Sequence, residues 1–261
     1  MFTLLNRIAV ITGGAGALGL AIAETLHSLG AHIVLLGRSP GKMEQALTQL
    51  DSERTRSSHY VCDVSDEASL ISVYNKIISI HSKVDILVTC AAAPATSGKL
   101  EDVSLEQWRS LLSIDLDGGF LSCKTFGRSM IDQRYGRIVN LTSFHDVATY
   151  PFRTVYNAAK SGVEGFSRAL AVEWGHYGIT VNTVAPGPIL TPRTKWFLSQ
   201  DENNEAGMLS RTPNLRIGTL TDVSSTVAFL VSGEAKHLNA QQIVVDGGWT
   251  ANAWWGRHTD L

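Results

Sequence analysis

A glycine-rich turn between a short apolar segment and a helical pattern, close to the N-terminus, is the feature that most constrains the fold. Residues 7–12 form an apolar run of strand type, and apolar residues recur along one side of residues 17–29. Between them, Gly14, Gly16 and Gly19 follow the spacing Gly-x-Gly-x-x-Gly. Such glycines let the backbone approach a pyrophosphate, and a helix N-terminus supplies free N–H groups to bind it. This context favours a dinucleotide site over a loop without a ligand.

The end of the next predicted strand, residues 32–36, bears on which dinucleotide is bound. An acidic residue there would accept hydrogen bonds from the adenosine ribose and would suit NAD. The chain instead has Arg38, whose planar cation matches a phosphate, and Ser39 as a further donor. The sequence therefore predicts NADP as the cofactor, with NAD less favoured, although a solvated loop arginine is the simpler alternative.

A second group of residues, Ser143, Tyr156 and Lys160, points to chemistry on a carbonyl group. In a helix, positions i and i+4 share one face, so Tyr156 and Lys160 are expected side by side. A nearby ammonium favours the phenolate form of a tyrosine, which can then exchange a proton with a carbonyl oxygen. The Ser143 hydroxyl can hydrogen-bond that oxygen as charge develops on it. The pattern predicts a carbonyl reductase, although Tyr-x-x-x-Lys also occurs by chance in helices.

Strand patterns alternate with helical ones along the whole chain, which predicts an α/β fold. The strands are expected near residues 7–12, 32–36, 59–62, 85–89, 136–142, 179–184 and 242–246. The helices are expected to include residues 17–29, 66–81, 104–130 (with a break), 154–174 and 221–231, with Ser104 and Gln107 as a capping box. Right-handed crossovers then give a doubly wound, seven-stranded parallel sheet, a Rossmann fold with the ligand at the carboxyl ends of the strands.

Composition limits the remaining possibilities. No linker or change of composition divides the 261 residues, so residues 1–261 are expected to form a single domain. A net charge of −2 gives no basic field for nucleic acid. Cys62, Cys90 and Cys123 are an odd, widely spaced set without metal-ligand spacing, which favours reduced thiols in the cytoplasm and no metal. Neither a signal peptide nor a membrane span is expected, because the glycine-broken apolar stretch is better explained as strand and nucleotide loop.

Several motifs in the correct order resemble the short-chain dehydrogenase/reductase family from about Arg7 to Trp249. The family's glycine motif aligns with Thr12 to Gly19, and its Ser, Tyr and Lys align with the residues above. Its other motifs correspond to Asp63-Val64, Thr89-Cys90-Ala91-Ala92, Pro186-Gly187 and Asp246-Gly247-Gly248.

The resemblance implies reversible hydride transfer between a nicotinamide and a carbonyl carbon. It implies that Tyr156 donates the proton during reduction, that Lys160 assists it and binds the nicotinamide ribose, and that Ser143 polarises the substrate oxygen. Asp115 stands where the family has the Asn of its proton relay. The residues that it places around the cofactor are Gly13, Ala15, Gly16, Leu18, Arg38, Ser39, Asp63, Val64, Cys90, Ala91, Tyr156, Lys160, Pro186, Ile189 and Thr191.

Three positions depart from the family pattern. Ala17 replaces the middle glycine of the loop, and the segment from Thr89 to Ala92 lacks both asparagines that normally tie strand ends together. At the relay position, Asp115 can still hold a water through its main-chain carbonyl, but its ionised carboxylate would favour the neutral phenol of a nearby tyrosine.

The substrate is expected to be covered by residues 191–218, the segment that usually varies in this family. Arg193, Lys195, Trp196 and Phe197 would suit a polar or anionic substrate with an apolar portion, but the aromatic residues also fit a role in packing this lid on the body. His145 is interpreted as a hydrogen-bonded loop residue in preference to a substrate contact. The aromatic tail, residues 249–261, carries three tryptophans whose large apolar area is expected to be covered, either by a neighbouring subunit or over the active site of its own chain. Relatives in the family are commonly homotetramers.

These observations favour an NADP-dependent reductase or dehydrogenase acting on a small carbonyl or alcohol. A faint likeness to gluconate and polyol dehydrogenases favours a hydroxylated, sugar-like ketone. A 3-oxoacyl-thioester reductase or a polyketide-type ketone reductase remains an alternative. A protein that binds NADP without catalysis and acts as an interaction module is an alternative of another class.

Overall fold

The computed structural model of the chain describes residues 3–94, 98–201 and 203–253. A sheet of seven parallel strands lies at its centre, in the order β3-β2-β1-β4-β5-β6-β7. The strands are β1 (Ile8–Thr12), β2 (His32–Gly37), β3 (Ser57–Val61), β4 (Ile86–Thr89), β5 (Gly136–Leu141), β6 (Ile179–Pro186) and β7 (Gln242–Val245). The order reverses beside β1, so the crevice between the ends of β1 and β4 lies at the switch point where ligands bind in such sheets. The predicted doubly wound α/β fold is confirmed.

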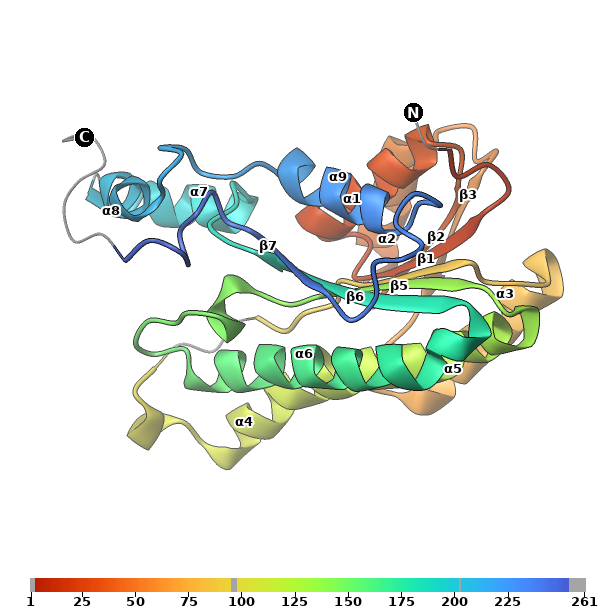
Figure 1. Cartoon of the computed structure of the whole chain (residues 1–261), viewed down its shortest axis with the longest axis horizontal. Helices are drawn as coiled ribbons and strands as arrows, with labels where there is room; N and C mark the ends of the chain where they lie inside the picture. The colour runs from red at the N-terminus through yellow and green to blue at the C-terminus, as the bar shows by residue number, and fades with distance from the viewer. Residues whose placement is uncertain (1–2, 95–97, 202, 254–261) are drawn as a thin grey trace.

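Helices cover both faces of the sheet, as Figure 1 shows. One face packs against α1 (Ala17–Ser28), α2 (Pro40–Leu50) and α9 (Leu220–Leu230), and the other against α3 (Glu67–His81), α5 (Gly118–Gln133) and α6 (Thr154–Trp174). Each interface holds its own apolar core: Ile22 and Val227 lie fully buried in the first, and Leu70 and Phe126 in the second. Burial on both faces explains why the inner strands are continuous apolar runs.

The long helical pattern at residues 104–130 is broken, as the sequence predicts. Helix α4 (Leu105–Leu112) begins at the predicted capping box of Ser104 and Gln107, and α5 begins at Gly118. The chain between them, Ser113–Asp117, makes one π-helical turn. Because such a turn shifts side chains off the regular helical face, it is common at functional sites. Here it directs the side chain of Asp115 inward, where it is completely shielded from solvent.

Three helices lie between predicted strands without a predicted residue range: α2, α7 (Pro192–Leu198) and α8 (Asn203–Arg211). Helices α7 and α8 stand apart from the sheet, above the carboxyl ends of its strands (Figure 1). None of the residues of α7 and α8 is buried, so neither helix has the buried apolar stripe of the helices that cover the sheet. Within the described ranges, none of the helices combines the length and the apolar character needed to cross a membrane.

Candidate active site

The glycine turn after β1 brings the chain close to β4. Gly13 has φ +66°, and a Cβ atom there would lie 2.8 Å from the backbone of Ala91, so a larger residue would force the two segments apart. Gly16 is the N-cap of α1 and makes no side-chain cap. The first N–H groups of α1 are therefore open to an anion, which fits the pyrophosphate of a dinucleotide.

The end of β4 is tied to this turn by a residue that the sequence analysis did not single out. The Thr12 hydroxyl accepts hydrogen bonds from the N–H groups of Cys90 and Ala91, at 3.1 and 3.2 Å. The Thr89 hydroxyl in turn donates to Asn140 at 2.7 Å. These threonine contacts join the strand ends, which is the function that the absent asparagines serve in the family pattern. The Cys90 thiol stays protonated, because burial raises its pKa to about 11.

Basic residues gather where β2 ends. Arg38 and Ser39 are exposed at the cavity edge, and Ser39 is the N-cap of α2 but makes no side-chain cap. Lys42, in the first turn of α2, lines the same part of the cavity and was missed by the sequence analysis. Its signal was the start of a helix at Ser39-Pro40, since proline is favoured at the first helical position. Opposite, hydrogen bonds from Ser65 lower the pKa of Asp63, with Arg38 contributing.

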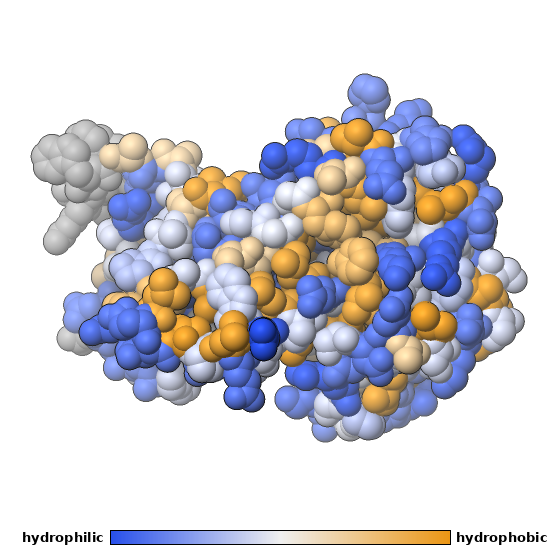
Figure 2. All heavy atoms as spheres, turned by 90° about the horizontal axis from the view of Figure 1, so that it is seen from below, coloured by the Kyte–Doolittle hydropathy of each residue, from blue (hydrophilic) through white to orange (hydrophobic). Residues whose placement is uncertain are grey.

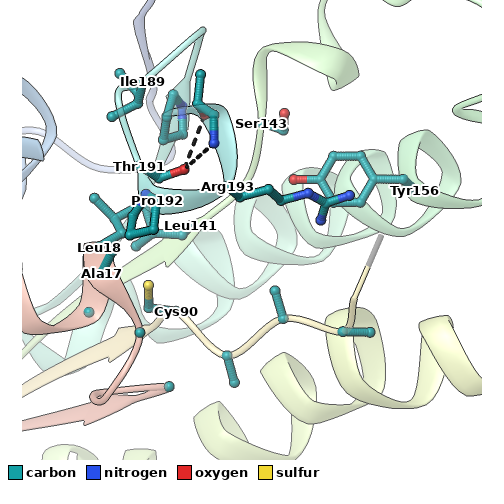
Figure 3. A pocket seen from close by; sticks show the side chains of 18 of the residues that line it. Ala17, Leu18, Cys90, Leu141, Ser143, Tyr156, Ile189, Thr191, Pro192 and Arg193 are labelled. Atoms are coloured by element: carbon teal, nitrogen blue, oxygen red, sulfur yellow. Dashed lines mark hydrogen bonds between the residues drawn. The ribbon is translucent and has the colours of Figure 1, made fainter. Parts of the chain in front are cut away.

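Ser143, Tyr156 and Lys160 come together at the start of α6. Ser143 lies two residues after the end of β5 and is buried, with its hydroxyl accepting the N–H of His145. Tyr156 and Lys160 lie on one face of α6, and the Lys160 Nζ is 5.6 Å from the centre of the tyrosine ring. The hydroxyls of Ser143 and Tyr156 face the same space (Figure 3). This is the arrangement that the spacing predicts.

Asp115 does more than the sequence analysis anticipated. Its Oδ1 accepts the N–H of Ala93 at 2.6 Å, and its Oδ2 lies 3.2 Å from the Nζ of Lys160. Lys160 also donates to the carbonyl of Leu141 at 3.3 Å. Burial opposes the charged form of Lys160, but Tyr156 and Asp115 outweigh it and raise its pKa above the usual value. The lysine is therefore held as an ammonium ion, paired with a carboxylate behind the cavity.

Aromatic residues form one wall beside Tyr156. The ring of His145 lies edge-on to that of Tyr156, with ring centres 5.6 Å apart. The ring centres of Phe144 and Trp249 are 4.8 Å apart. The predicted hydrogen bond of His145 is present, since its Nδ1 lies 3.3 Å from the Thr149 hydroxyl, but the residue also lines the cavity. Burial and the charge of Arg153 lower the pKa of His145 to about 4, so the imidazole is neutral at neutral pH.

Residues 191–218 border the open side of the cavity. Thr191 caps α7 by accepting the N–H of Thr194 at 3.1 Å, and Arg193 extends from α7 into the cavity (Figure 3). Trp196 is 64% exposed, so it does not pack this segment on the body, whereas Phe197 and Met208 line the cavity. In the tail, Trp249 lines the cavity of its own chain; the other two tryptophans, Trp254 and Trp255, lie outside the described residues.

One cavity of about 1160 Å³ connects all these parts. Every residue predicted to contact the cofactor lines it, together with Ser143. Asp115 does not; it borders a small void of about 10 Å³ behind Lys160. The cavity is large enough for a dinucleotide and a small second molecule, since ligand pockets commonly measure about 300–1000 Å³.

Comparison with known proteins defines the class. The family model described as enoyl-(acyl carrier protein) reductase matches residues 13–250. The chain therefore belongs to the short-chain dehydrogenase/reductase family, as the motifs indicate, and is an oxidoreductase that acts on alcohol or ketone groups.

Similar proteins act on several kinds of substrate. Galactitol 2-dehydrogenase of Rhizobium johnstonii is 36% identical over 253 residues, which cover 95% of this chain and 97% of that protein. The 3-oxoacyl-(acyl-carrier-protein) reductase of Escherichia coli is 35% identical over 243 residues, which cover 93% of this chain and 97% of that protein. A gluconate 5-dehydrogenase from Burkholderia cenocepacia is 29% identical in sequence, and its crystal structure is a complex with NADP and tartrate. The two structures superpose with a TM-score of 0.91 over 97% of this chain and 98% of that chain.

Proposed function

We propose that the chain is an NADP(H)-dependent dehydrogenase or reductase of a small hydroxylated ketone or secondary alcohol, with Ser143, Tyr156, Lys160 and Asp115 as its active-site residues. The observation that carries the proposal is that the first three line the same cavity as the glycine turn. A protein that only binds NADP would need no proton donor there, which argues against the non-catalytic alternative.

In this mechanism the nicotinamide, when bound, supplies or accepts the hydride. Tyr156 passes a proton to the carbonyl oxygen during reduction and takes it back during oxidation. Lys160, whose charged form is favoured by Tyr156 and by the buried carboxylate of Asp115, favours the phenolate between proton transfers. Ser143 donates a hydrogen bond to the oxygen as negative charge develops on it. The aromatic wall keeps water away from the reacting carbon, which strengthens these electrostatic effects.

The preference for NADP rests on Arg38 and Lys42. Both cations line the cavity at the end of β2, where the adenosine ribose is expected, and a carboxylate is absent at residues 37–39. A guanidinium and an ammonium at the uncapped start of α2 would bind a ribose phosphate. The NADP complex of the similar gluconate 5-dehydrogenase agrees with this assignment.

A sugar-derived substrate is favoured by the size and lining of the site. The second molecule would meet Asn203, Asn204 and Arg193 at the open side, which can bind several hydroxyl groups. The similarity to galactitol 2-dehydrogenase supports this choice. Reduction of a 3-oxoacyl thioester is the second candidate, favoured by the similarity to the Escherichia coli reductase.

The chain is further proposed to act as a homo-oligomer, a tetramer by family resemblance, in the cytoplasm. Apolar side chains gather on the face formed by α4, α5 and α6 (Figure 2). Leu105, Phe120 and Val172 are exposed on these three helices, Val172 by 78%. Burying such side chains against a second copy would be favourable.

The test begins with titration of NADPH and NADH, followed by turnover of polyols, sugar-derived ketones and β-keto thioesters. We expect NADPH to bind at least tenfold more tightly and one substrate class to react. In Tyr156→Phe, turnover is expected to fall by at least about 100-fold with NADPH affinity retained. Equal turnover in Tyr156→Phe would refute the catalytic assignment, and failure of either nucleotide to bind would refute the cofactor site.

A further inference from the structure

The substrate end of the cavity is strongly cationic. Arg153 at the N-cap of α6, Arg193 in α7 and Arg211 at the end of α8 all line it. Among the described lining residues only Asp63 carries a carboxylate, and it lies on the cofactor side, beside Arg38. Guanidinium groups that share one end of a cavity, with no described carboxylate lining that end, disfavour one another, and a bound anion would relieve this repulsion. As far as the described residues show, this end of the cavity therefore favours a negatively charged ligand.

Two of these arginines are held in place by aromatic rings instead of acids. The guanidinium of Arg153 lies 5.5 Å from the ring centre of Tyr150, and that of Arg211 lies 5.2 Å from Trp249. Neither forms an ion pair within residues 3–94, 98–201 and 203–253. The Nη2 of Arg211 also donates to the carbonyl of Asn252 at 3.5 Å. Stacking orders a guanidinium without using its N–H groups, so the remaining donors suit binding of an oxyanion.

Two described carboxylates on adjoining segments, those of Asp246 and Asp146, are engaged elsewhere. Asp246 accepts the N–H groups of Gly248 and Thr250, at 2.8 and 2.7 Å. Asp146 accepts the side-chain amide of Gln242 at 2.8 Å. Neither lines the cavity, so neither neutralises Arg153 or Arg211. Arg193 follows the predicted cofactor contact Thr191 by two residues and can bind the pyrophosphate as well as the substrate, so only Arg153 and Arg211 are assigned to the substrate alone.

The two stacked arginines are linked through the aromatic wall beside Tyr156. Phe144 contacts both Tyr150 and Trp249, with ring centres 6.2 and 4.8 Å apart. An apolar surface thus joins two cationic groups and borders the proposed proton donor. A ligand matching it has an anionic end and a short carbon chain that presents a carbonyl or hydroxyl to Tyr156.

We propose that the substrate is an anionic oxo or hydroxy acid, whose carboxylate binds Arg153 and Arg211 while its carbon chain lies against Phe144 and Trp249. This inference rests on the proposed function, because it is Tyr156 that identifies the reacting end of the cavity. It narrows that function from sugar-like ketones in general to hydroxy acids and their oxo forms, in preference to neutral polyols.

The test compares gluconate with galactitol, a neutral polyol of the same chain length, on the enzyme saturated with NADP. Calorimetry is expected to give at least tenfold tighter binding of gluconate, weakening as NaCl rises from 50 to 500 mM. Arg153→Gln and Arg211→Gln should each weaken gluconate binding roughly 10- to 100-fold, the effect of losing a charge-assisted hydrogen bond. Lys195→Gln removes a neighbouring exposed cation of α7 outside the cavity and should change binding less than about twofold.

Binding and turnover separate the two proposals. Gluconate binding that is unaffected by either arginine substitution, or no tighter than galactitol binding, overturns the acid site whether or not polyols are oxidised. Tighter arginine-dependent binding of glucose 6-phosphate than of gluconate assigns the site to a phosphate and overturns the carboxylate. Arginine-dependent gluconate binding without turnover of any substrate upholds the acid site and refutes the catalytic function.

Discussion

The Nζ of Lys160 lies 3.2 Å from Oδ2 of Asp115, and both side chains are almost completely shielded from solvent. The proposed catalytic lysine is therefore one half of a buried ion pair. The other oxygen of Asp115 accepts the N–H of Ala93, next to the segment that lines the cofactor cavity. The carboxylate thus joins the lysine of α6 to the chain after β4. Its negative charge also counteracts the effect of the lysine's positive charge on the phenol of Tyr156.

Asp115→Asn should shift the pH profile of alcohol oxidation to lower pH. The amide oxygen can still accept the N–H of Ala93, but the negative charge is removed, so the charge of Lys160 acts undiminished on the phenol. We expect the rising limb of kcat to move to lower pH and the Tm to fall, because the ammonium of Lys160 loses its buried partner. An unmoved limb, or one displaced to higher pH, would contradict an electrostatic role for Asp115. Asp117→Asn, on the same π-helical turn, serves as the control.

Lys160→Met should destabilise the fold as well as stop catalysis. It leaves the carboxylate of Asp115 buried without its cation, and breaking one partner out of a buried pair costs about 3–5 kcal/mol. The double variant Asp115→Asn/Lys160→Met removes both charges and should recover most of that free energy of unfolding, without recovering turnover. Urea unfolding of both variants measures the difference. If the double variant were as unstable as the single one, the pair would not be the cause.

Thr12→Val should loosen the join between β1 and the chain after β4. The isosteric valine keeps the packing but leaves the N–H groups of Cys90 and Ala91 without their acceptor. We expect a loss of about 1–3 kcal/mol in the free energy of unfolding and weaker NADPH binding, since both residues line the cavity. Thr12→Ser retains the hydroxyl and should remain close to the unmodified protein. Equal stability of the serine and valine variants would show that this hydroxyl does not hold the strand ends together.

The sequence was sufficient to predict the parts of the fold that are buried on both sides. The inner strands are continuous apolar runs, and α6 occupies the predicted residues 154–174, because packing dictates these patterns directly. Helices α7 and α8 have no buried residues and escaped prediction, although Thr191-Pro192 is a recognisable helix start.

The site was predictable where chemistry depends on spacing along one element, and less so where it depends on contacts between elements. The i, i+4 relation put Tyr156 beside Lys160, and strand ends placed Ser143 near them. The pairing of Asp115 with Lys160 joins residues 45 positions apart and depends on the π-helical turn, which local sequence did not reveal. The stacking of Arg211 on Trp249, which brings the tail to the cavity of its own chain, is likewise a contact between distant segments that local sequence did not reveal.

A last prediction concerns Asp146, which lies behind the aromatic wall. Burial raises its pKa from 3.8 to about 6, although hydrogen bonds from Thr142 and Gln242 act in the opposite direction. A carboxyl whose pKa is raised on folding contributes stability that is fully present below the unfolded value of 3.8 and is lost as the pH rises through about 6. Above that pH, the folded protein holds an unfavourable buried charge.

Asp146→Asn should therefore raise the Tm above pH 6 and make little difference near pH 4. The amide oxygen can still accept the hydrogen bond from Gln242, and the ionisation cost, at most about 3 kcal/mol, is removed. Thermal unfolding from pH 4 to pH 8 measures the difference, with the exposed Asp102→Asn as the control. If the difference in Tm between the variant and the unmodified protein stays constant from pH 4 to pH 8, Asp146 does not ionise in this range. If that difference widens toward acid pH, the proposed effect of ionisation on stability has the wrong sign.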